Sequence, residues 1–380
     1  MPIYEGYGTI TDKLTFIIDI GAAYTKIGFS AEFAPRAIVA SEVRCKNTNQ
    51  VRNIYDYKDK EDLYDLLVEF IHLLYFKYAL ISPKDRAVVI VESLLCPTLF
   101  RETLAKVLFY HYEVASLLVV PSHLVSLATL AIDTGLVLDI GYTEAVAIPI
   151  CHGSPVLHAW QALPLGSQAI HSHVKTLLSA DNTGIQNISE SVLEDIKEDI
   201  KVRCCFVTKR ERAEKLRSVS SDIAPCPSVV YPLGGTKSLN VSGKLREMMY
   251  EIFFDEDLDH LCISTMILNV IASVDVESRT LLAENIVLIG GTCMAPGFKA
   301  RLKAELYRQL KNERYSKFKN IKTIKFHTPP AKENYTAWLG AAIYGATEIV
   351  SMKALSKDQY FKEKRLPDWW SNLKDVVRSI

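Results

Sequence analysis

The chain has no net charge, because 44 Lys and Arg residues balance 44 Asp and Glu residues. A protein that binds nucleic acid or an anionic membrane through bulk charge would carry a basic excess. The sequence also lacks a long uninterrupted apolar run: the longest, residues 115–132, contains Pro121, Ser122 and His123. Such a run is too short and too polar for a convincing membrane span. We therefore expect no nucleic-acid binding and no direct membrane insertion.

Paired cysteine motifs are also missing. Eight cysteines are present, but none forms a C-x-x-C pair or another metal-type spacing. Free thiols in a reducing compartment are therefore expected, and a zinc site is not. The first residues, MPIYEGYGTITDK, lack the basic-then-apolar profile of a secretory signal. These absences predict a cytosolic or nuclear protein.

Two stretches of the chain repeat one pattern: FIIDIGAAYTKIGF at 16–29 and LVLDIGYTEAVAIPI at 136–150. Each has an apolar strand, an Asp, one residue, a Gly and a second strand. This pattern predicts a β-hairpin whose glycine can adopt a positive φ. Two copies indicate a duplicated fold, with two hairpin tips facing each other across a cleft.

Strand and helix patterns alternate along the rest of the chain, which predicts an α/β sheet layered with helices. Strands are expected at 37–40, 87–93, 116–121, 155–163, 284–289 and 323–329. Helices are expected at 60–80, 98–112, 122–132, 167–178, 191–206, 243–254, 261–273, 336–350 and after Pro296. Residues 208–228 are charged and then rich in Ser and Pro, which predicts an exposed, solvated insertion.

Three glycine-containing turns, at 19–21, 139–141 and 290–291, each follow a strand. Backbone N–H groups bind anions where glycine permits close approach, so the three turns together predict a phosphate clamp. Lys26 lies on the second strand of the first hairpin and can reach the same anion. Asp19 and Asp139 are the candidate ligands of a hydrated Mg²⁺, which usually retains several waters and binds one or two carboxylates.

The sequence resembles the actin-related proteins over almost its whole length. DIGAAYTKIGFSAEFAPRAIVAS is similar to the first actin phosphate loop, LVLDIGYTEAVAIPI to the second, and LIGGTCMAPGF to the adenosine-side loop. The resemblance implies the duplicated two-domain α/β fold of actin, hexokinase and the heat-shock ATPases, with a cleft between the domains. Domain I would comprise 1–129 and 336–380, with 41–58 as a truncated second subdomain. Domain II would comprise 130–335, with 165–258 as the smaller inserted subdomain.

Within that family, MPIYEG, RETLAKVLF, PSHL, CFV and PPAK are similar to the class of subunits at the pointed end of dynactin. This implies a structural subunit that caps the actin-like filament of dynactin and supports dynein-driven transport. The implied partners are actin-related filament subunits, actin, and other pointed-end dynactin subunits, with dynein and microtubules as indirect partners. The implied location is the cytoplasm and cytoskeleton, including centrosome and microtubules.

The departures from the family pattern argue against ATP hydrolysis. In the first loop, Ala22 and Ala23 stand where actins have Ser and Gly. In the second loop, the polar, glycine-rich residues after Gly141 are replaced by Tyr142, Thr143 and Glu144. The water-positioning Gln of the family falls at Ser122 and its His partner at Val146, and neither replacement activates water as an amide and an imidazole would. Val202 and Ala295 replace a ribose-binding Glu and an adenine-stacking Tyr. We expect no catalytic residues and no enzyme activity.

The residues retained for nucleotide binding come from both halves of the chain. They are Asp19, Gly21, Lys26, Asp139, Gly141, Gly166, Lys201, Gly290, Gly291 and Thr292. This set is compatible with two states: a cleft that holds ATP or ADP with Mg²⁺ as a structural ligand, and an empty cleft.

A deletion separates the chain from actin itself. About twenty residues lie between Ser41 and the helix expected from Lys60, fewer than a three-stranded subdomain with turns requires. The opposite face, formed by the helices from Ser122 and Thr336 and by LSKDQY, is expected to form an apolar groove for a neighbour. We therefore predict a subunit that docks on the last protomer of a filament and accepts no further one.

Two other functions remain as alternatives. A nuclear actin-related subunit of a chromatin complex would share the fold. A sugar-kinase-like, ATP-dependent enzyme would share the phosphate clamp but needs a carboxylate base beside a sugar pocket. The sequence shows no candidate for that base.

Overall fold

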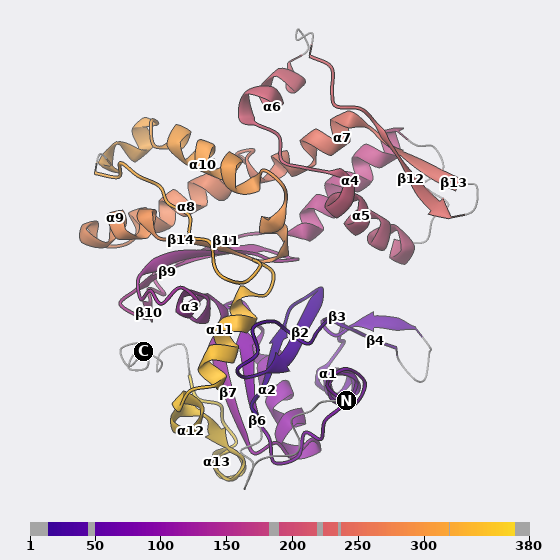
Figure 1. Cartoon of the computed structure of the whole chain (residues 1–380), viewed down its shortest axis with the longest axis vertical. Coiled ribbons are helices and arrows are strands. Elements are labelled where there is room, and N and C mark those ends of the chain that lie inside the picture. The colour runs from indigo at the N-terminus through magenta and orange to yellow at the C-terminus, as the bar shows by residue number, and fades with distance from the viewer. Residues whose placement is uncertain are drawn as a thin grey trace. The chain divides into compact units, whose positions relative to one another are not determined.

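The computed structural model describes residues 14–44, 50–181, 190–218, 223–234, 237–318 and 320–368. Cys45, residues 219–222 of the expected insertion and the pair Trp369 and Trp370 lie outside these ranges. The chain divides into two compact units (Figure 1), one formed by Met1–Ala131 and Tyr335–Ile380 and the other by Ile132–Asn334. Each unit is built around a sheet of its own.

The sheet of the first unit has six strands in the order β15, β7, β6, β1, β2, β3. Their bounds are β1 Phe16–Ile20, β2 Tyr24–Phe29, β3 Ala37–Ala40, β6 Ala87–Glu92, β7 Ser116–Pro121 and β15 Leu355–Ser356. β1 and β2 pair antiparallel, which confirms the first predicted hairpin, while β6 lies parallel to β1 and β7 parallel to β6. A separate two-stranded hairpin, β4 (Glu42–Arg44) and β5 (Val51–Asn53), follows β3.

The helices predicted in the first unit form, although those from Ser122 and Thr336 end earlier than expected, and two short helices within 349–363 were not predicted. They are α1 Lys60–His72 continued by the π-helix η1 Leu73–Ala79, α2 Thr98–Lys106 continued by the π-helix η2 Val107–His111, α3 Ser122–Ala128, α11 Thr336–Gly345, α12 Ile349–Lys353 and α13 Lys357–Glu363. The predicted small-residue helix packs closely on α3, because a Cβ at Gly340 would lie 1.9 Å from the carbonyl oxygen of Val125. Only glycine permits this approach of two helix backbones.

The sheet of the second unit runs β10, β9, β8, β14, with β11 also paired to β9. The bounds are β8 Gly135–Ile140, β9 Ala145–Cys151, β10 Ser154–Pro155, β11 Gln161–Leu163 and β14 Ile286–Ile289. β8 and β9 form the second predicted hairpin, and β14 lies parallel to β8. The strand expected at 155–163 is instead two short strands. The strand expected at 323–329 forms a single bridge from Phe326 to Ile286, because the Pro-Pro pair at its end cannot donate to a ladder.

Helices and a further hairpin complete the second unit. They are α4 Ser167–Asp181, α5 Glu190–Cys204, α6 Arg210–Arg217, the hairpin β12 Val229–Gly234 with β13 Lys237–Val241, α7 Gly243–Met248, η4 Met249–Phe253, α8 Ile263–Ala272, α9 Val276–Glu284, η5 Gly291–Met294, α10 Phe298–Gln309 and η6 Glu313–Phe318. The β12–β13 hairpin and α9 were not anticipated from the sequence. The apolar helix α8 packs against β9 and α10 and fills the core of this unit.

The insertion predicted at 208–228 is mostly exposed in its described part, as expected, but it contains the helix α6 rather than being a loop throughout. Thr208 is 2 % exposed, and α6 places Ala213 at 1 % exposure. Arg212 binds the buried carboxylate of Glu247, with 2.9 Å between its Nη2 and Oε1. This bond, together with the backbone N–H of Cys226, lowers the pKa of Glu247 to about 2 despite its burial. The charges that suggested a loop are therefore the groups that hold α6 in place.

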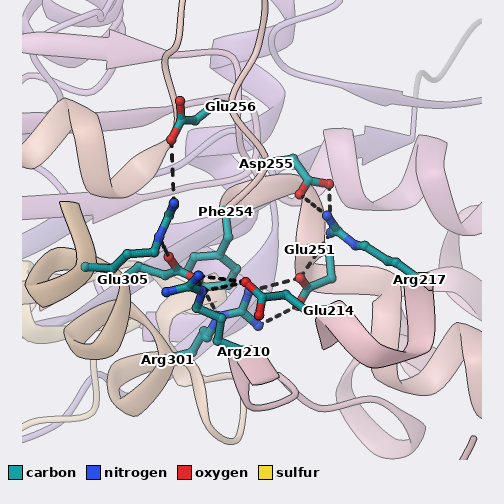
Figure 2. A pocket seen from close by; sticks show the side chains of 10 residues that line it. Arg210, Glu214, Arg217, Glu251, Phe254, Asp255, Glu256, Arg301 and Glu305 are labelled. Carbon is teal, nitrogen blue, oxygen red and sulfur yellow. Dashed lines mark hydrogen bonds and ion pairs between the residues drawn. The ribbon is translucent and has the colours of Figure 1, made fainter. Parts of the chain in front are cut away.

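A cavity of about 230 Å³ lies beside α6, lined almost entirely by charged side chains (Figure 2). At its floor, Arg301 makes two bonds to Glu251, of 2.8 and 3.0 Å, and one of 2.9 Å to Glu305. Arg217 joins Glu251 at 3.1 Å and Asp255 at 2.6 Å. Because these ion pairs connect α6, η4 and α10, we interpret the cavity as part of a structural network rather than as a ligand site.

Candidate functional site

The first predicted turn, between β1 and β2, keeps its two charged residues paired with each other. Asp19 and Lys26 are cross-strand partners, and Lys26 Nζ lies 3.0 Å from Asp19 Oδ2. Their side chains are 13 % and 16 % exposed. The ammonium group that we expected at a phosphate is thus neutralised by the carboxylate that we expected at a metal.

Backbone carbonyls of the same turn accept hydrogen bonds from the segment that follows β3. Ser41 Oγ donates to the carbonyl oxygen of Gly21 at 2.6 Å, and the Ser41 N–H donates to that of Ala23 at 2.9 Å. Asn53 Nδ2 donates to the carbonyl oxygen of Ala22 at 2.8 Å. The Tyr55 hydroxyl completes the set with a longer bond of 3.5 Å to Ile20. The turn is therefore held by Ser41, Asn53 and Tyr55.

Contacts on the other side of that segment fix it against two helices. Arg52 forms a bidentate pair with Asp62 of α1, with distances of 2.9 and 2.7 Å. This pair and the backbone N–H of Lys58 lower the pKa of Asp62 to about 2. The ring of Tyr55 stacks on Phe100 of α2, with centroids 4.6 Å apart. Residues 52–62 thus connect the first turn to the helices of the unit.

The second predicted turn, between β8 and β9, is held mainly by backbone groups. The carbonyl oxygen of Gly141 accepts from the Ser167 N–H at 3.1 Å and from the Thr292 hydroxyl at 3.2 Å. The carbonyl oxygen of Tyr142 accepts from the Gln168 N–H at 2.8 Å. A Cβ at Gly166 would lie 2.3 Å from the same Tyr142 oxygen. The start of α4 therefore lies directly on this turn, which requires glycine at 166.

Lys201 and Thr292 join this turn through a chain of polar contacts. Ser167 Oγ lies 2.9 Å from Thr292 Oγ1 and accepts from Lys201 Nζ at 2.8 Å. Lys201 is 5 % exposed and forms an ion pair with Glu198. Burial lowers the pKa of Lys201, and the negative charge of Glu198 opposes that effect. Four predicted site residues, Gly141, Gly166, Lys201 and Thr292, are thus brought together.

A charged cluster that the sequence did not reveal supports Lys201 from behind. His171 of α4 is 3 % exposed, and its ring nitrogens lie 2.8 Å from Glu194 Oε2 and 3.0 Å from Glu198 Oε2. Burial favours the neutral acid at Glu198, but the His171 bond and the Lys201 charge outweigh it and lower its pKa to about 2. The i, i+4 spacing of the two glutamates on α5 was the available signal, and it points equally to an ordinary solvated helix face.

The third predicted turn follows β14 and lies against Asp139. Gly290 has φ +94°, and a Cβ there would be 2.2 Å from the carbonyl oxygen of Ile140 and 2.7 Å from Asp139 Oδ1. Its N–H donates to the carbonyl oxygen of Glu333 at 2.9 Å. Within the described residues, the buried Oδ1 of Asn334 has no hydrogen-bond partner, and its Cβ lies 3.9 Å from where a Cβ at Gly291 would be. An orphaned acceptor at this turn fits a ligand that carries a donor, such as a purine nucleotide.

One detail of the predicted turns is wrong. Gly21 and Gly141 lie outside the left-handed region, which is occupied at Gly290. At Gly21 glycine is favoured by space instead, because its N–H donates to the carbonyl oxygen of Tyr24 and a Cβ would be 2.8 Å from that oxygen. At Gly141 the nearest atom to an added Cβ is 3.6 Å away, an ordinary contact.

The positions that replace the hydrolytic and ribose-binding residues of the family carry no polar group that is free to reach a nucleotide. The Ser122 hydroxyl lies 3.0 Å from His123 Nδ1, and the residue is 5 % exposed. Val146 is a buried residue of β9 with 2 % exposure. Val202, where the family has a ribose-binding acid, is 63 % exposed on α5.

The described part of the chain offers neither a metal cluster nor a disulfide. It contains no group of three or more His, Cys, Asp or Glu side chains arranged to hold a metal ion. Its seven cysteines, from Cys96 to Cys293, are free thiols. None of its helices combines the length and the apolar character that crossing a membrane requires.

Comparisons with known proteins agree with this architecture. The family model described as "Actin" matches residues 59–365. "Actin-related protein 10" of Dictyostelium discoideum is 28% identical over 439 aligned residues, which cover 96% of this chain and 90% of that protein. "Putative actin-29" of the same organism is 24% identical over 376 residues, covering 91% and 94%. The two hairpin turns, each in an α/β unit of its own, and the match over most of the chain lead to one conclusion: the chain belongs to the actin family.

Proposed function

We propose that this actin-related chain is a non-catalytic structural subunit that caps the pointed end of the actin-like filament of dynactin. Its similarity to an actin-related protein extends over 96% of the chain, and the sequence blocks typical of the pointed-end class support the finer assignment. Its partners would be actin-related filament subunits, actin and other pointed-end dynactin subunits. Through them it would support dynein-driven transport along microtubules in the cytoplasm.

The observation that carries this proposal is the short segment between Ser41 and Lys60. It contains two paired strands of three residues each, β4 and β5. Ser41 and Asn53 are bonded to the first turn of their own unit. A segment of this length, engaged in this way, supplies no three-stranded subdomain to meet a following protomer. A heterologous interface that is blocked on one face ends the assembly.

The elements expected on the opposite face are ordered. Gly340 of α11 lies against the backbone of Val125 in α3. α13 begins with a capping box between Ser356 and Gln359, and its Tyr360 stacks on Phe109 at 4.5 Å. In the proposal, these elements receive the preceding subunit.

A nucleotide has a structural role in this proposal. The residues of the second unit fit one: Gly290 and Gly291 give close access, Asn334 offers an unpaired acceptor, and Lys201 is close to Thr292 through Ser167. ATP or ADP would not be hydrolysed, because Ala22, Ser122 and Val146 lack the groups that orient water. Native mass spectrometry of the purified chain tests for a bound nucleotide, independently of capping.

Filament-end labelling tests the capping role. Gold-labelled chain is mixed with preformed actin-like filaments, and the expected result is one label at one end of each filament. A chimaera in which residues 41–58 are replaced by the complete second subdomain of an actin serves as the matched variant. It should allow filaments to grow past the label. Labels along the filament sides, or long filaments formed by the unmodified chain alone, would contradict the proposal.

A further inference from the structure

We propose that Ser41, Asn53 and Tyr55 act as a built-in ligand of the first turn, which therefore keeps one conformation whether or not ATP is present. The inference concerns the isolated chain and goes beyond the capping role, whose tests use filaments. It rests on the contacts of the turn from Ile20 to Tyr24 with the segment that follows β3.

The carbonyl groups of the turn are all engaged inside the unit. The Ile20 carbonyl accepts from the Tyr55 hydroxyl, and the Ala22 carbonyl accepts from the Asn53 amide. Ser41 donates twice, from its hydroxyl to Gly21 and from its N–H to Ala23. The Tyr24 carbonyl accepts from the Gly21 N–H at 3.2 Å. Ile20 to Ala23 are half-buried, and a carbonyl that is shielded from water and loses its donor costs more than an average hydrogen bond contributes. The conformation in which all five are satisfied is therefore strongly preferred.

Burial makes these contacts hard to replace with water. Ser41 and Thr25 are both 0 % exposed, and their hydroxyl oxygens lie 2.8 Å apart. Ser41 is thus a shared partner for Gly21, Ala23 and Thr25. If the turn moved, several buried polar groups would lose their partners together.

The donors are positioned without any contribution from a ligand. Asn53 Oδ1 accepts from the Tyr55 N–H at 2.9 Å, which orients the amide so that its Nδ2 faces Ala22. Arg52, the neighbour of Asn53, is held by Asp62 of α1. The segment therefore presents its side chains from a fixed position against α1 and α2.

The charge of Lys26 is also satisfied in place by Asp19 at 3.0 Å. An ammonium group without a partner would favour a turn that closes on an anion. Here the pairing removes that electrostatic preference. A ligand shifts a conformational equilibrium only by its differential affinity for the two states. We therefore expect ATP to change the conformation of this turn very little.

Hydrogen–deuterium exchange of the full chain tests the inference. The amides of Gly21 and Ser41 report directly, because each donates to a carbonyl of the turn. We expect their exchange rates to differ by less than about twofold with and without millimolar ATP and Mg²⁺. Ser41→Ala and Asn53→Ala should each raise these rates by roughly fivefold, the effect of losing one buried hydrogen bond. Unchanged amides in β6 show that a variant is folded.

Two further variants sharpen the result. Asn53→Asp keeps the acceptor for Tyr55 but cannot donate to Ala22, so it should loosen the turn as Asn53→Ala does. Asn269→Ala removes an amide that accepts from Tyr315 at 3.0 Å in the other unit, and it should leave the turn unchanged. Strong protection of Gly21 and Ser41 by ATP, or no response to Ser41→Ala and Asn53→Ala, would overturn the inference.

Discussion

The two Asp-x-Gly turns have the same sequence pattern but are held by different kinds of group. In the first unit, side chains of Ser41 and Asn53 reach the carbonyls of the turn. In the second unit, backbone N–H groups of Ser167 and Gln168, at the start of α4, bind Gly141 and Tyr142. The first turn is thus held mainly by side-chain hydrogen bonds, and the second mainly by backbone hydrogen bonds from the start of α4.

This difference determines how each turn can be broken. Removal of a hydroxyl or an amide is enough to release the first turn, because its donors are side-chain groups. Apart from the Thr292 hydroxyl, the second turn keeps its donors under such substitutions, and it is disturbed mainly by an added atom, since Gly166 lies directly against Tyr142. A duplicated motif has therefore been stabilised in two independent ways.

The largest effect is expected for Gly166→Ala. The new Cβ would lie 2.3 Å from the Tyr142 carbonyl oxygen and 2.6 Å from its carbon, and backbone atoms cannot rotate away. We expect the free energy of unfolding to fall by about 3 kcal/mol, the upper range for overpacking. Urea denaturation followed by circular dichroism measures it. Gly141→Ala in the same turn is the matched control and should cost well under about 1 kcal/mol, because its nearest contact is 3.6 Å. Equal losses would remove the argument from backbone proximity.

Acid should weaken the second turn through Glu198. Its pKa of about 2 lies below the usual 4.5, so its stabilising contribution is present above the usual value and is lost as pH falls from about 4.5 towards 2. After allowance for solvent screening of a side chain that is 30 % exposed, we expect about 2 kcal/mol. Thermal unfolding of the wild type and Glu198→Gln between pH 6 and 3 should show a flatter profile for the variant. Glu277→Gln, exposed on α9, should leave the profile as in the wild type.

Ser41→Ala tests the side-chain support of the first turn. It leaves the Gly21 carbonyl and the Thr25 hydroxyl without a buried partner, which should lower the free energy of unfolding by about 1.5 kcal/mol. Thr25→Val removes the second of these groups at nearly constant volume. The double variant should therefore lose less than the sum of the single variants, by about 0.5 to 1 kcal/mol in a denaturation cycle. Strict additivity would show that the two hydroxyls are not coupled.

Local patterns predicted the strands and helices that carry both turns. The run at 16–29 is apolar or β-branched up to Asp19, and it forms β1 and β2. The stripe within 60–80 forms α1 and η1, with Leu63, Leu67 and Phe70 buried. These elements follow from periodicities of two and 3.6 residues, which depend on nearby residues alone.

The failures concern partners that are distant in the sequence. Residues 208–228 are mostly exposed, as expected, but the loop that we predicted contains α6, and its Arg212 binds Glu247, 35 residues away. Likewise, the sequence near Ser41 contains no sign that its hydroxyl would reach Gly21. Polar side chains in a short segment indicate exposure on average, and only the tertiary structure shows which of them have buried partners.

The smallest effect distinguishes the long bond of Tyr55 from the short bonds of Ser41 and Asn53. The Tyr55 hydroxyl lies 3.5 Å from the Ile20 carbonyl oxygen, at the limit of a hydrogen bond, whereas its ring stacks on Phe100 at 4.6 Å. Tyr55→Phe keeps the ring and should therefore change the free energy of unfolding by about 0.3 kcal/mol. Tyr55→Ala loses the stack as well and should cost about 2 kcal/mol or more. Urea denaturation of both variants separates the two contributions, and a large loss in Tyr55→Phe would place the hydroxyl among the principal supports of the turn.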